Sequence, residues 1–343
     1  MKKLLLISFF FIFQKANAQT TIRVVNGQNL QTVMDAAADN SIIIIEGGNY
    51  GNISFNKPLK LYGTGYFLDG TLANTGLQAS VATSIINSIT FNTNSSNSEI
   101  HGLTTNDIQV SSNQISIYRT KFGMLNIGSA VSNFNNTLLK QNLFTGFTIH
   151  PNCLNIVFNN NIIRGNGVIG GASTSFFTNN TFVDGSFITD AQGNPGIFKS
   201  NIFFPSFTTS VCNGGYFNFF SNTQNYLINN VFGIKVRCGC GGCSEESFGL
   251  NDFSATNKVN QNFSVMYISP TPDMAPDARY QLAPNSPAKG AGEGGTDAGA
   301  FGGDEPYVLS GIPSIPSIYQ LSVPNQVPQN GILNIQIKAK TNN

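Results

Sequence analysis

Short apolar segments recur along the middle of the chain at nearly constant spacing, and each follows an asparagine in the pattern Asn-x-apolar. The steps between these asparagines are 19, 19, 21 and 29 residues, and a weaker copy of the pattern precedes them at residues 119–122. A unit of about twenty residues cannot bury its apolar side chains alone, so a repeat of this length predicts stacked coils of a solenoid. The recurring asparagines are Asn142, Asn161, Asn180, Asn201 and Asn230.

Two or three short strands per repeat predict an all-β fold, a right-handed parallel β-helix. Equivalent positions of stacked coils form columns about 4.8 Å apart, so the Phe or Ile of each repeat should build an internal stack. The asparagine column fits a tight turn, because Asn tolerates left-handed backbone geometry and its amide can bond to the amide of the next coil. We interpret this column as a structural ladder. The alternative is that these asparagines contact a ligand.

The segment before the first strand predicts a helix that caps the β-helix. Its apolar residues follow the spacing of one helical face, which can cover the open end of the first coil. These residues are Leu30, Val33, Met34 and Ala37.

The residues after position 304 differ from the repeats in being punctuated by proline. Within this tail, residues 317–323 and 332–340 alternate apolar and polar positions, which predicts a β-hairpin. The predicted organisation is therefore a leader at residues 1–18, a β-helix at 19–303 and a hairpin tail at 304–343.

The first 18 residues have the form of an export signal. Lys2 and Lys3 precede an apolar run at residues 4–13, and Ala16-Asn17-Ala18 forms a small-x-small cleavage site. This run is too short to span a bilayer. We expect cleavage before Gln19 and a secreted mature protein without a membrane span, in the periplasm, at the cell surface or outside the cell.

Two segments carry a resemblance to a known family. Residues 29–65 resemble the first coil of pectate-lyase-like right-handed β-helix proteins of the secreted bacterial type. Asn285-Ser286-Pro287-Ala288 and the run from Gly295 to Phe301 resemble their closing segment. With the repeats, the likeness covers roughly residues 25 to 303. It implies the fold, but the family includes lyases, hydrolases, epimerases and proteins of unassigned role, so no single activity follows.

Ionisable residues are sparse. The net charge is +1 and 10% of residues are charged, which argues against a nucleic-acid partner. A lyase needs calcium-binding carboxylates and a base, and a hydrolase needs converging acids. Asp184 and Asp190 lack carboxylate neighbours in their columns, and the two histidines, His101 and His150, are far apart along the chain and are interpreted as structural. We predict no catalytic residue and no cofactor.

The alternative is a polysaccharide lyase or glycoside hydrolase acting on an acidic polysaccharide. Its acids would then lie in the less regular coils. The candidates are Asp69, Asp107, Asp252, Asp273 and Asp277.

Five cysteines in an exported chain suggest disulfides. Three of them, Cys238, Cys240 and Cys243, form a compact cluster, and Cys212 lies one coil earlier. A disulfide between Cys212 and this cluster is favoured over a metal site, because a fourth metal ligand is missing from the cluster. Cys153 would then be buried and unpaired.

The longest step between repeats contains an aromatic insertion. Insertions in solenoids project from one face and often carry binding, and aromatic rings can stack on sugars. The candidate ligand residues are Tyr216, Phe217, Phe219 and Tyr226. The sequence therefore favours a non-catalytic, secreted β-helix protein that binds a polysaccharide or acts as an adhesin. It does not set an oligomeric state.

Overall fold

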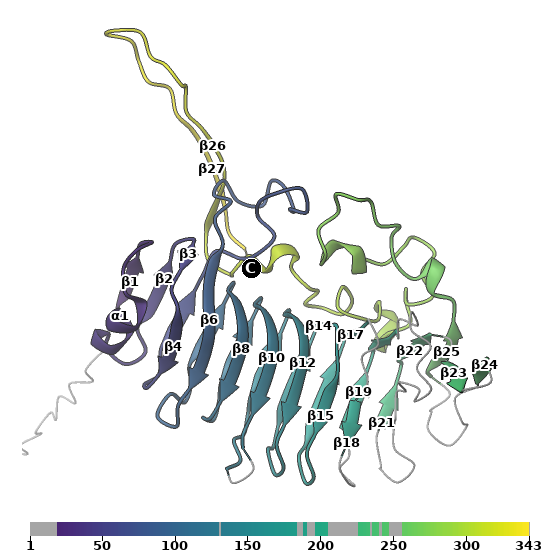
Figure 1. The fold of residues 1–343 in the computed structure, drawn as a ribbon. Coiled ribbons are helices and arrows are strands. Elements are labelled where there is room, and N and C mark those ends of the chain that lie inside the picture. The colour runs from purple at the N-terminus through teal and green to yellow at the C-terminus, as the bar shows by residue number, and fades with distance from the viewer. Residues whose placement is uncertain are drawn as a thin grey trace, which may run out of the picture.

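The chain folds as a parallel β-helix of about eight turns, shown in Figure 1, which confirms the predicted solenoid. The structure is a computed structural model. The residues that it describes are 19–129, 132–183, 188–190, 196–204, 226–233, 235–239, 242–246 and 256–342, with only the backbone for 188–190, 235–239 and 242–246.

Two long parallel sheets form the walls of the β-helix. Sheet A holds ten strands in sequence order along the axis. They are β1 (Thr21–Val24), β2 (Ile42–Ile45), β5 (Lys60–Tyr62), β7 (Glu99–His101), β9 (Ser116–Tyr118), β11 (Leu138–Lys140), β13 (Ile156–Asn159), β16 (Ser175–Thr178), β19 (Gly196–Lys199) and β21 (Tyr226–Ile228).

From β7 onwards, sheet B receives the chain directly after each strand of sheet A. Its strands are β3 (Gly48–Asn49), β4 (Asn52–Phe55), β6 (Ser84–Phe91), β8 (Thr104–Val110), β10 (Lys121–Ile127), β12 (Leu143–Ile149), β14 (Ile162–Ile163), β15 (Gly167–Ile169), β17 (Thr181–Phe182), β18 (Ile188–Asp190), β20 (Ile202–Phe203), β22 (Val231–Gly233) and β25 (Lys258–Gln261).

The interior is a continuous apolar core in which equivalent side chains of successive coils stack. The rings of Phe182 and Phe203 are stacked with centroids 4.7 Å apart, and those of Phe203 and Phe232 are 4.9 Å apart. A second stack runs through Phe158 and Phe177 on the sheet A side, at 4.5 Å. These spacings match the rise of about 4.8 Å per coil, so the predicted internal stack is present.

The first coil is capped by the predicted helix, α1 (Leu30–Ala36). The Oδ1 atom of Asn29 accepts a hydrogen bond from the backbone N–H of Thr32 at 3.0 Å, which satisfies one of the free amides of the first turn. Leu30 and Met34 are buried against the core.

The repeated asparagines form a buried ladder at the corner between the sheets. The Oδ1 atom of Asn180 accepts two bonds from Asn161, from its backbone N–H at 3.0 Å and its side-chain amide at 2.9 Å. The side-chain amide of Asn180 donates in turn to Asn201 Oδ1. The same bonds link Asn142, Asn161, Asn180, Asn201 and Asn230, and the ladder continues to Asn257.

The left-handed backbone does not fall on the ladder asparagines, as the sequence suggested, but on the residue before each of them. Its φ is +59° at Gln141, +53° at Asn160, +54° at Asn179 and +56° at Ser200. The turn therefore reverses the backbone one residue early. This leaves the ladder residue free to point inwards and sends the side chain of the left-handed residue outwards.

The C-terminal part of the chain runs back along this corner as a strap, which we define as residues 286–313. Its alanines pack on apolar side chains at the start of the sheet B strands in a second core cluster. The cluster includes Ala288, Ala291, Ala298 and Ala300 from the strap and Leu143, Ile162, Ile202 and Val231 from the coils. The strap includes residue 304, at which the sequence predicts the start of the hairpin tail.

Two antiparallel hairpins complete the fold. One, β23 (Lys235–Gly239) with β24 (Gly242–Glu246), follows the last regular coils. The other, β26 (Ser317–Ser322) with β27 (Gln336–Lys340), is the predicted C-terminal hairpin and extends away from the β-helix in Figure 1.

Candidate functional site

The strap is held by the outward-pointing residues of the corner. Asn160 donates from Nδ2 to the carbonyls of Ala300 and Gly302, at 2.9 and 2.7 Å. Gln141 bonds in the same way to the carbonyls of Glu305 and Pro306. Further along, Arg119, Asn179 and Ser200 also bond to the strap backbone. The polar column that the sequence leaves unexplained thus binds the protein's own chain.

Glycines replace these side chains in the first coils. A Cβ atom at Gly65 would lie 2.5 Å from the carbonyl oxygen of Ser310, and one at Gly102 would lie 2.9 Å from the ring of Pro313. Both glycines also have positive φ. The strap therefore lies directly on the backbone here, and larger residues cannot be accommodated without displacing it.

A buried polar cluster fixes the far end of the strap. The carboxylate of Asp277 accepts the backbone N–H of Ser310 at 2.7 Å and the side-chain amide of Asn74 at 2.9 Å. The hydroxyls of Tyr66 and Tyr307 bond to each other beside it. Burial raises the pKa of the Asp277 carboxyl. This acid, one of the five candidates for catalysis, therefore holds the fold together instead of facing a groove.

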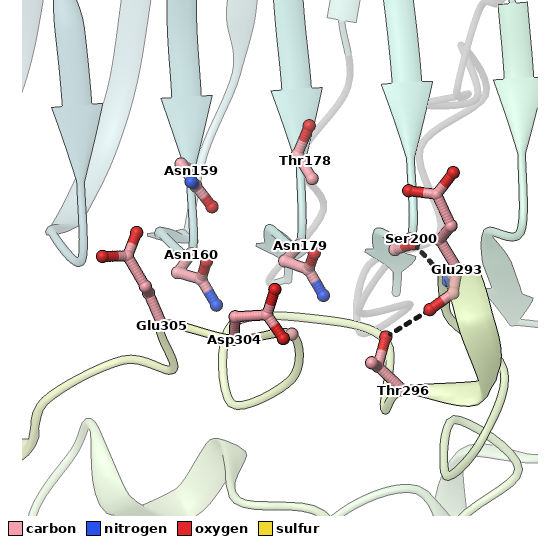
Figure 2. A pocket seen from close by; sticks show the side chains of 10 residues that line it. Asn159, Asn160, Thr178, Asn179, Ser200, Glu293, Thr296, Asp304 and Glu305 are labelled. Carbon is pink, nitrogen blue, oxygen red and sulfur yellow. Dashed lines mark hydrogen bonds between the residues drawn. The ribbon is translucent and has the colours of Figure 1, made fainter.

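A narrow polar groove, the strap groove, lies between the strap and the ends of the sheet A strands, with a volume of about 220 Å³. Figure 2 shows Asp304 and Glu305 on the strap side, near the corner asparagines Asn160 and Asn179. Glu293 lies at the other end beside Ser200, whose hydroxyl accepts the backbone N–H of Glu293 at 2.9 Å.

Two of the three carboxylates of the strap groove are paired with lysines. Lys199 is ion-paired with Glu293 and Lys140 with Glu305. A hydrolase needs two carboxyl groups that face each other across the scissile bond. The polar lining of the groove offers hydrogen bonds to a ligand.

The remaining candidate acids are dispersed. Asp107 lies on β8 between Ser88 and Met124 in the neighbouring strands, so it has no carboxylate beside it in its column. Asp69 and Asp273 are exposed on loops. Asp252 and Asp184 lie outside the described residues. Across the part of the chain that the structure describes, no group of three His, Cys, Asp or Glu residues is placed to hold a metal ion.

His101 belongs to an aromatic stack on the outer face of sheet A. Its ring lies between those of Tyr62 and Tyr118, with centroids 4.3 and 4.5 Å away. Its Nε2 atom is 3.2 Å from Glu99 Oε2, and Lys60 pairs with the other oxygen at 2.8 Å. Burial lowers the pKa of His101, whereas the hydrogen bond from His101 and the charge of Lys60 lower the pKa of Glu99 to about 2. With both ring faces covered, His101 offers no surface to a substrate.

A second cavity, the arginine pocket, combines cations and aromatic rings. It has a volume of about 340 Å³ and lies where residues 263–280 pack against the coils. Arg164 follows β14 and is exposed, whereas Arg279 belongs to a short 3-10 helix (Ala278–Tyr280) and donates from Nε and Nη2 to the carbonyl of Met274. The described lining of this pocket contains both guanidinium groups and no carboxylate.

Three rings line the arginine pocket, and one of them is perpendicular to the other two. Tyr267 meets Phe263 edge to face at 5.8 Å and Tyr280 at 5.7 Å. Half of the Phe263 surface is exposed, although it belongs to an aromatic cluster. Such a wall presents ring faces and edges of fixed orientation to a ligand.

A third cation lies close to this pocket. Lys121 begins β10, and its Nζ atom is 5.5 Å from the centre of the Phe67 ring. Burial lowers the pKa of Lys121, and the positive charge of Arg164 lowers it further. Lys121 and Arg164 therefore lie near enough for the charge of one to act on the other. An ion pair with Asp184, one coil later in the sequence, is another interpretation of Arg164, and Asp184 lies outside the described residues.

The candidates that the sequence placed in the aromatic insertion are only partly described. Tyr226 begins β21 and is 56% exposed. Tyr216, Phe217 and Phe219 lie outside the described residues.

The cysteines are distributed as follows. Cys153 is buried with a free thiol, whose pKa is raised by burial. Cys238 and Cys243 are direct partners across β23 and β24. Cys212 and Cys240 lie outside the described residues, so the predicted link from Cys212 stays a prediction.

No family model matches this chain, and no curated protein or solved structure gives a match. The described residues also contain no helix of the length and apolarity that a membrane crossing requires. The candidate ligand sites are therefore the strap groove and the arginine pocket.

Proposed function

We propose that this protein is secreted and binds acidic glycans without cleaving them, and that the arginine pocket is its ligand site. The observation that carries the proposal is the meeting of two guanidinium groups with three aromatic rings around one cavity. Its volume of about 340 Å³ lies within the range of about 300–1,000 Å³ that is usual for ligand sites. The export signal predicted at residues 1–18 supports the proposed location.

Each part of this pocket suits one feature of an acidic sugar. A planar guanidinium can bind a carboxylate or sulfate through two parallel hydrogen bonds. Aromatic faces pack against the C–H groups of a sugar ring, and Ser264 and Ser269 add hydroxyls at the rim. Because Arg279 is fixed through the Met274 carbonyl, less conformational freedom is lost on binding than for a free side chain.

The test is a binding screen with soluble polysaccharides of defined charge. We expect retention of polyuronates or sulfated glycans, weakening with salt, and weaker retention of their neutral counterparts. Arg164→Gln and Arg279→Gln should each reduce affinity. Arg23→Gln is the matched control, because Arg23 is an exposed arginine on β1 that pairs with Glu46 in the first coil. Equal binding of neutral and acidic polymers, unaffected by either substitution, would refute the proposal.

The aromatic insertion predicted from the sequence is the competing location. Replacing residues 216–220 by a short Gly-Ser link should leave binding intact if the arginine pocket is the site. If binding is lost in that variant and kept in Arg164→Gln, the insertion is the site instead.

The strap groove favours one alternative function, a glycoside hydrolase, because it brings Glu293, Asp304 and Glu305 to one cavity. We expect no release of reducing ends and no calcium-dependent formation of unsaturated products from polyuronates. Cleavage that disappears in Asp304→Asn while binding persists would establish the hydrolase.

We also propose a disulfide between Cys238 and Cys243 once the chain has been exported and oxidised. Facing residues of antiparallel strands have Cα atoms about 4.5–5.5 Å apart, which lies within the range of about 4.4–6.8 Å that disulfides require. Peptide mapping without reduction should recover this link. A link from Cys212 to Cys238 or Cys243 would contradict it.

A further inference from the structure

The C-terminal hairpin is a two-stranded ribbon with chemically different faces. Leu321 lies opposite Ile337, and Ile318 lies opposite Ala339, so these side chains share one face. Gln320 lies opposite Lys338 on the other face. There the Nζ atom of Lys340 is also 5.6 Å from the centre of the Tyr319 ring. One face is therefore aliphatic and the other polar and basic.

The aliphatic face and the loop beyond it are exposed. Ile337 is 57% exposed and Leu321 53%, and Ile332 in the loop reaches 84%. A two-stranded ribbon is marginally stable in water when nothing packs on its face. The aliphatic residues of this segment that are exposed are Ile318, Leu321, Val323, Val327, Ile332, Leu333, Ile335 and Ile337.

We infer that this aliphatic face is the interface of a dimer, with the hairpin of a second copy of this chain as its occupant. A two-fold interface must be complementary to itself, and an uncharged aliphatic face meets this condition. Eight side chains exposed by about half amount to roughly 700 Å² per copy, close to the about 800 Å² per partner of a standard interface.

The placement of the lysines is compatible with a second copy on the aliphatic face. Lys338 and Lys340 alternate with Ile337 and Ala339 along β27, so they lie on the face opposite the aliphatic one. A dimer formed through the aliphatic face leaves both lysines in water, so their charges are not desolvated. A segment on an anionic membrane has the same arrangement of faces, so flotation with vesicles distinguishes the two occupants.

The base of the hairpin provides a seat for the tip of the partner's hairpin. An apolar groove of about 470 Å³ runs between the hairpin and the first coils, and its lining includes Ile44, Pro316, Ile318 and Leu321. Ile318 and Leu321 belong to both this groove and the aliphatic face, so the two surfaces are continuous. In an antiparallel pair of hairpins, the loop that carries Ile332 would reach this groove in the other copy.

The proposal is tested by sedimentation velocity of the purified protein across a range of concentrations. We expect a dimer that dissociates on dilution. The double variant Leu321→Glu with Ile337→Glu should raise the dissociation constant at least about 30-fold, because it places charges in the core of the interface. Ile332→Asp, which leaves both strands intact, should weaken the dimer as well. Circular dichroism should show the β-helix unchanged in each variant.

The matched control is Gln320→Glu with Gln336→Glu, which adds the same two charges to the same strands on the opposite face. This variant should remain dimeric. A wild-type protein that is monomeric at all concentrations would overturn the inference, as would a control that dissociates equally. Flotation with vesicles of anionic phospholipid gives the remaining outcome: a monomer that floats with them and loses this ability in Leu321→Glu with Ile337→Glu uses the face for a membrane.

Discussion

The strap corner and the arginine pocket are both built where the C-terminal part of the chain packs on the coils, but they use their polar groups differently. At the strap corner, the amides of Asn160 and Gln141 are directed to backbone carbonyls of the strap. At the arginine pocket, Arg164 and Arg279 face one cavity together with aromatic rings. A frequent polar residue type at a regular position therefore indicates architecture here, whereas we propose a ligand site where two arginines line one cavity.

The largest expected effect is a loss of stability at the asparagine ladder. Asn180→Ala removes a fully buried amide, so Asn161 loses its two bonds to Asn180 Oδ1 and Asn201 loses the bond from the Asn180 side chain. We expect the free energy of unfolding to fall by about 3 kcal/mol, because several buried polar groups lose their hydrogen bonds. Denaturant unfolding measures this loss. Glycan affinity per folded molecule should not change, and a variant of normal stability that lost affinity would mean that the ladder is a binding site.

A smaller loss is expected from detaching the strap at one point. Asn160→Gly keeps the left-handed backbone and deletes the two bonds to Ala300 and Gly302, which should cost about 1–2 kcal/mol. Hydrogen exchange should show faster opening of the strap.

Asn155→Gly is the control for that substitution. Asn155 also has a positive φ of 58°, but it is exposed, and its amide bonds only to the exposed side chain of Asn136. We expect a change within about 0.5 kcal/mol. Equal losses in both variants would show that the backbone conformation matters at this corner and the strap bonds do not.

The next prediction concerns the affinity of the arginine pocket for an acidic polysaccharide. Arg164→Gln should weaken binding of an acidic polysaccharide about tenfold, which corresponds to about 1.4 kcal/mol, while the free energy of unfolding should change by no more than about 0.5 kcal/mol because Arg164 is exposed. Affinity chromatography and thermal unfolding measure the two quantities. Loss of stability without loss of affinity would assign Arg164 to the fold.

The repeat made the β-helix, its capping helix and its C-terminal hairpin predictable, because each depends on a local period of apolar residues. The Asn-x-apolar signal found five ladder residues but not Asn257, where the charged Lys258 occupies the middle position that is uncharged in the other copies. The strap bonds were not predictable, since Asn160 contacts residues 140 positions away. The arginine pocket was not predictable for the same reason, because Arg164 and Arg279 lie far apart in the sequence.

The smallest effect should come from Glu99, a charged residue that is engaged structurally and so belongs with the strap corner in this comparison. Its folded-state pKa of about 2 lies below its ordinary value of 4.5, so the unfolded chain takes up a proton first as the pH falls. The stabilisation by Glu99 is therefore complete above about pH 4.5 and is lost between that value and about pH 2. In Glu99→Gln the unfolding free energy should be lower near neutral pH and should depend less steeply on pH in this window.

His101, whose pKa is lowered, contributes a separate loss of stability as the pH falls below 6.5, because the unfolded chain is protonated there first. Unfolding curves at closely spaced pH values distinguish the two windows. A pH profile of Glu99→Gln that matches the wild-type profile would contradict the structural role of Glu99.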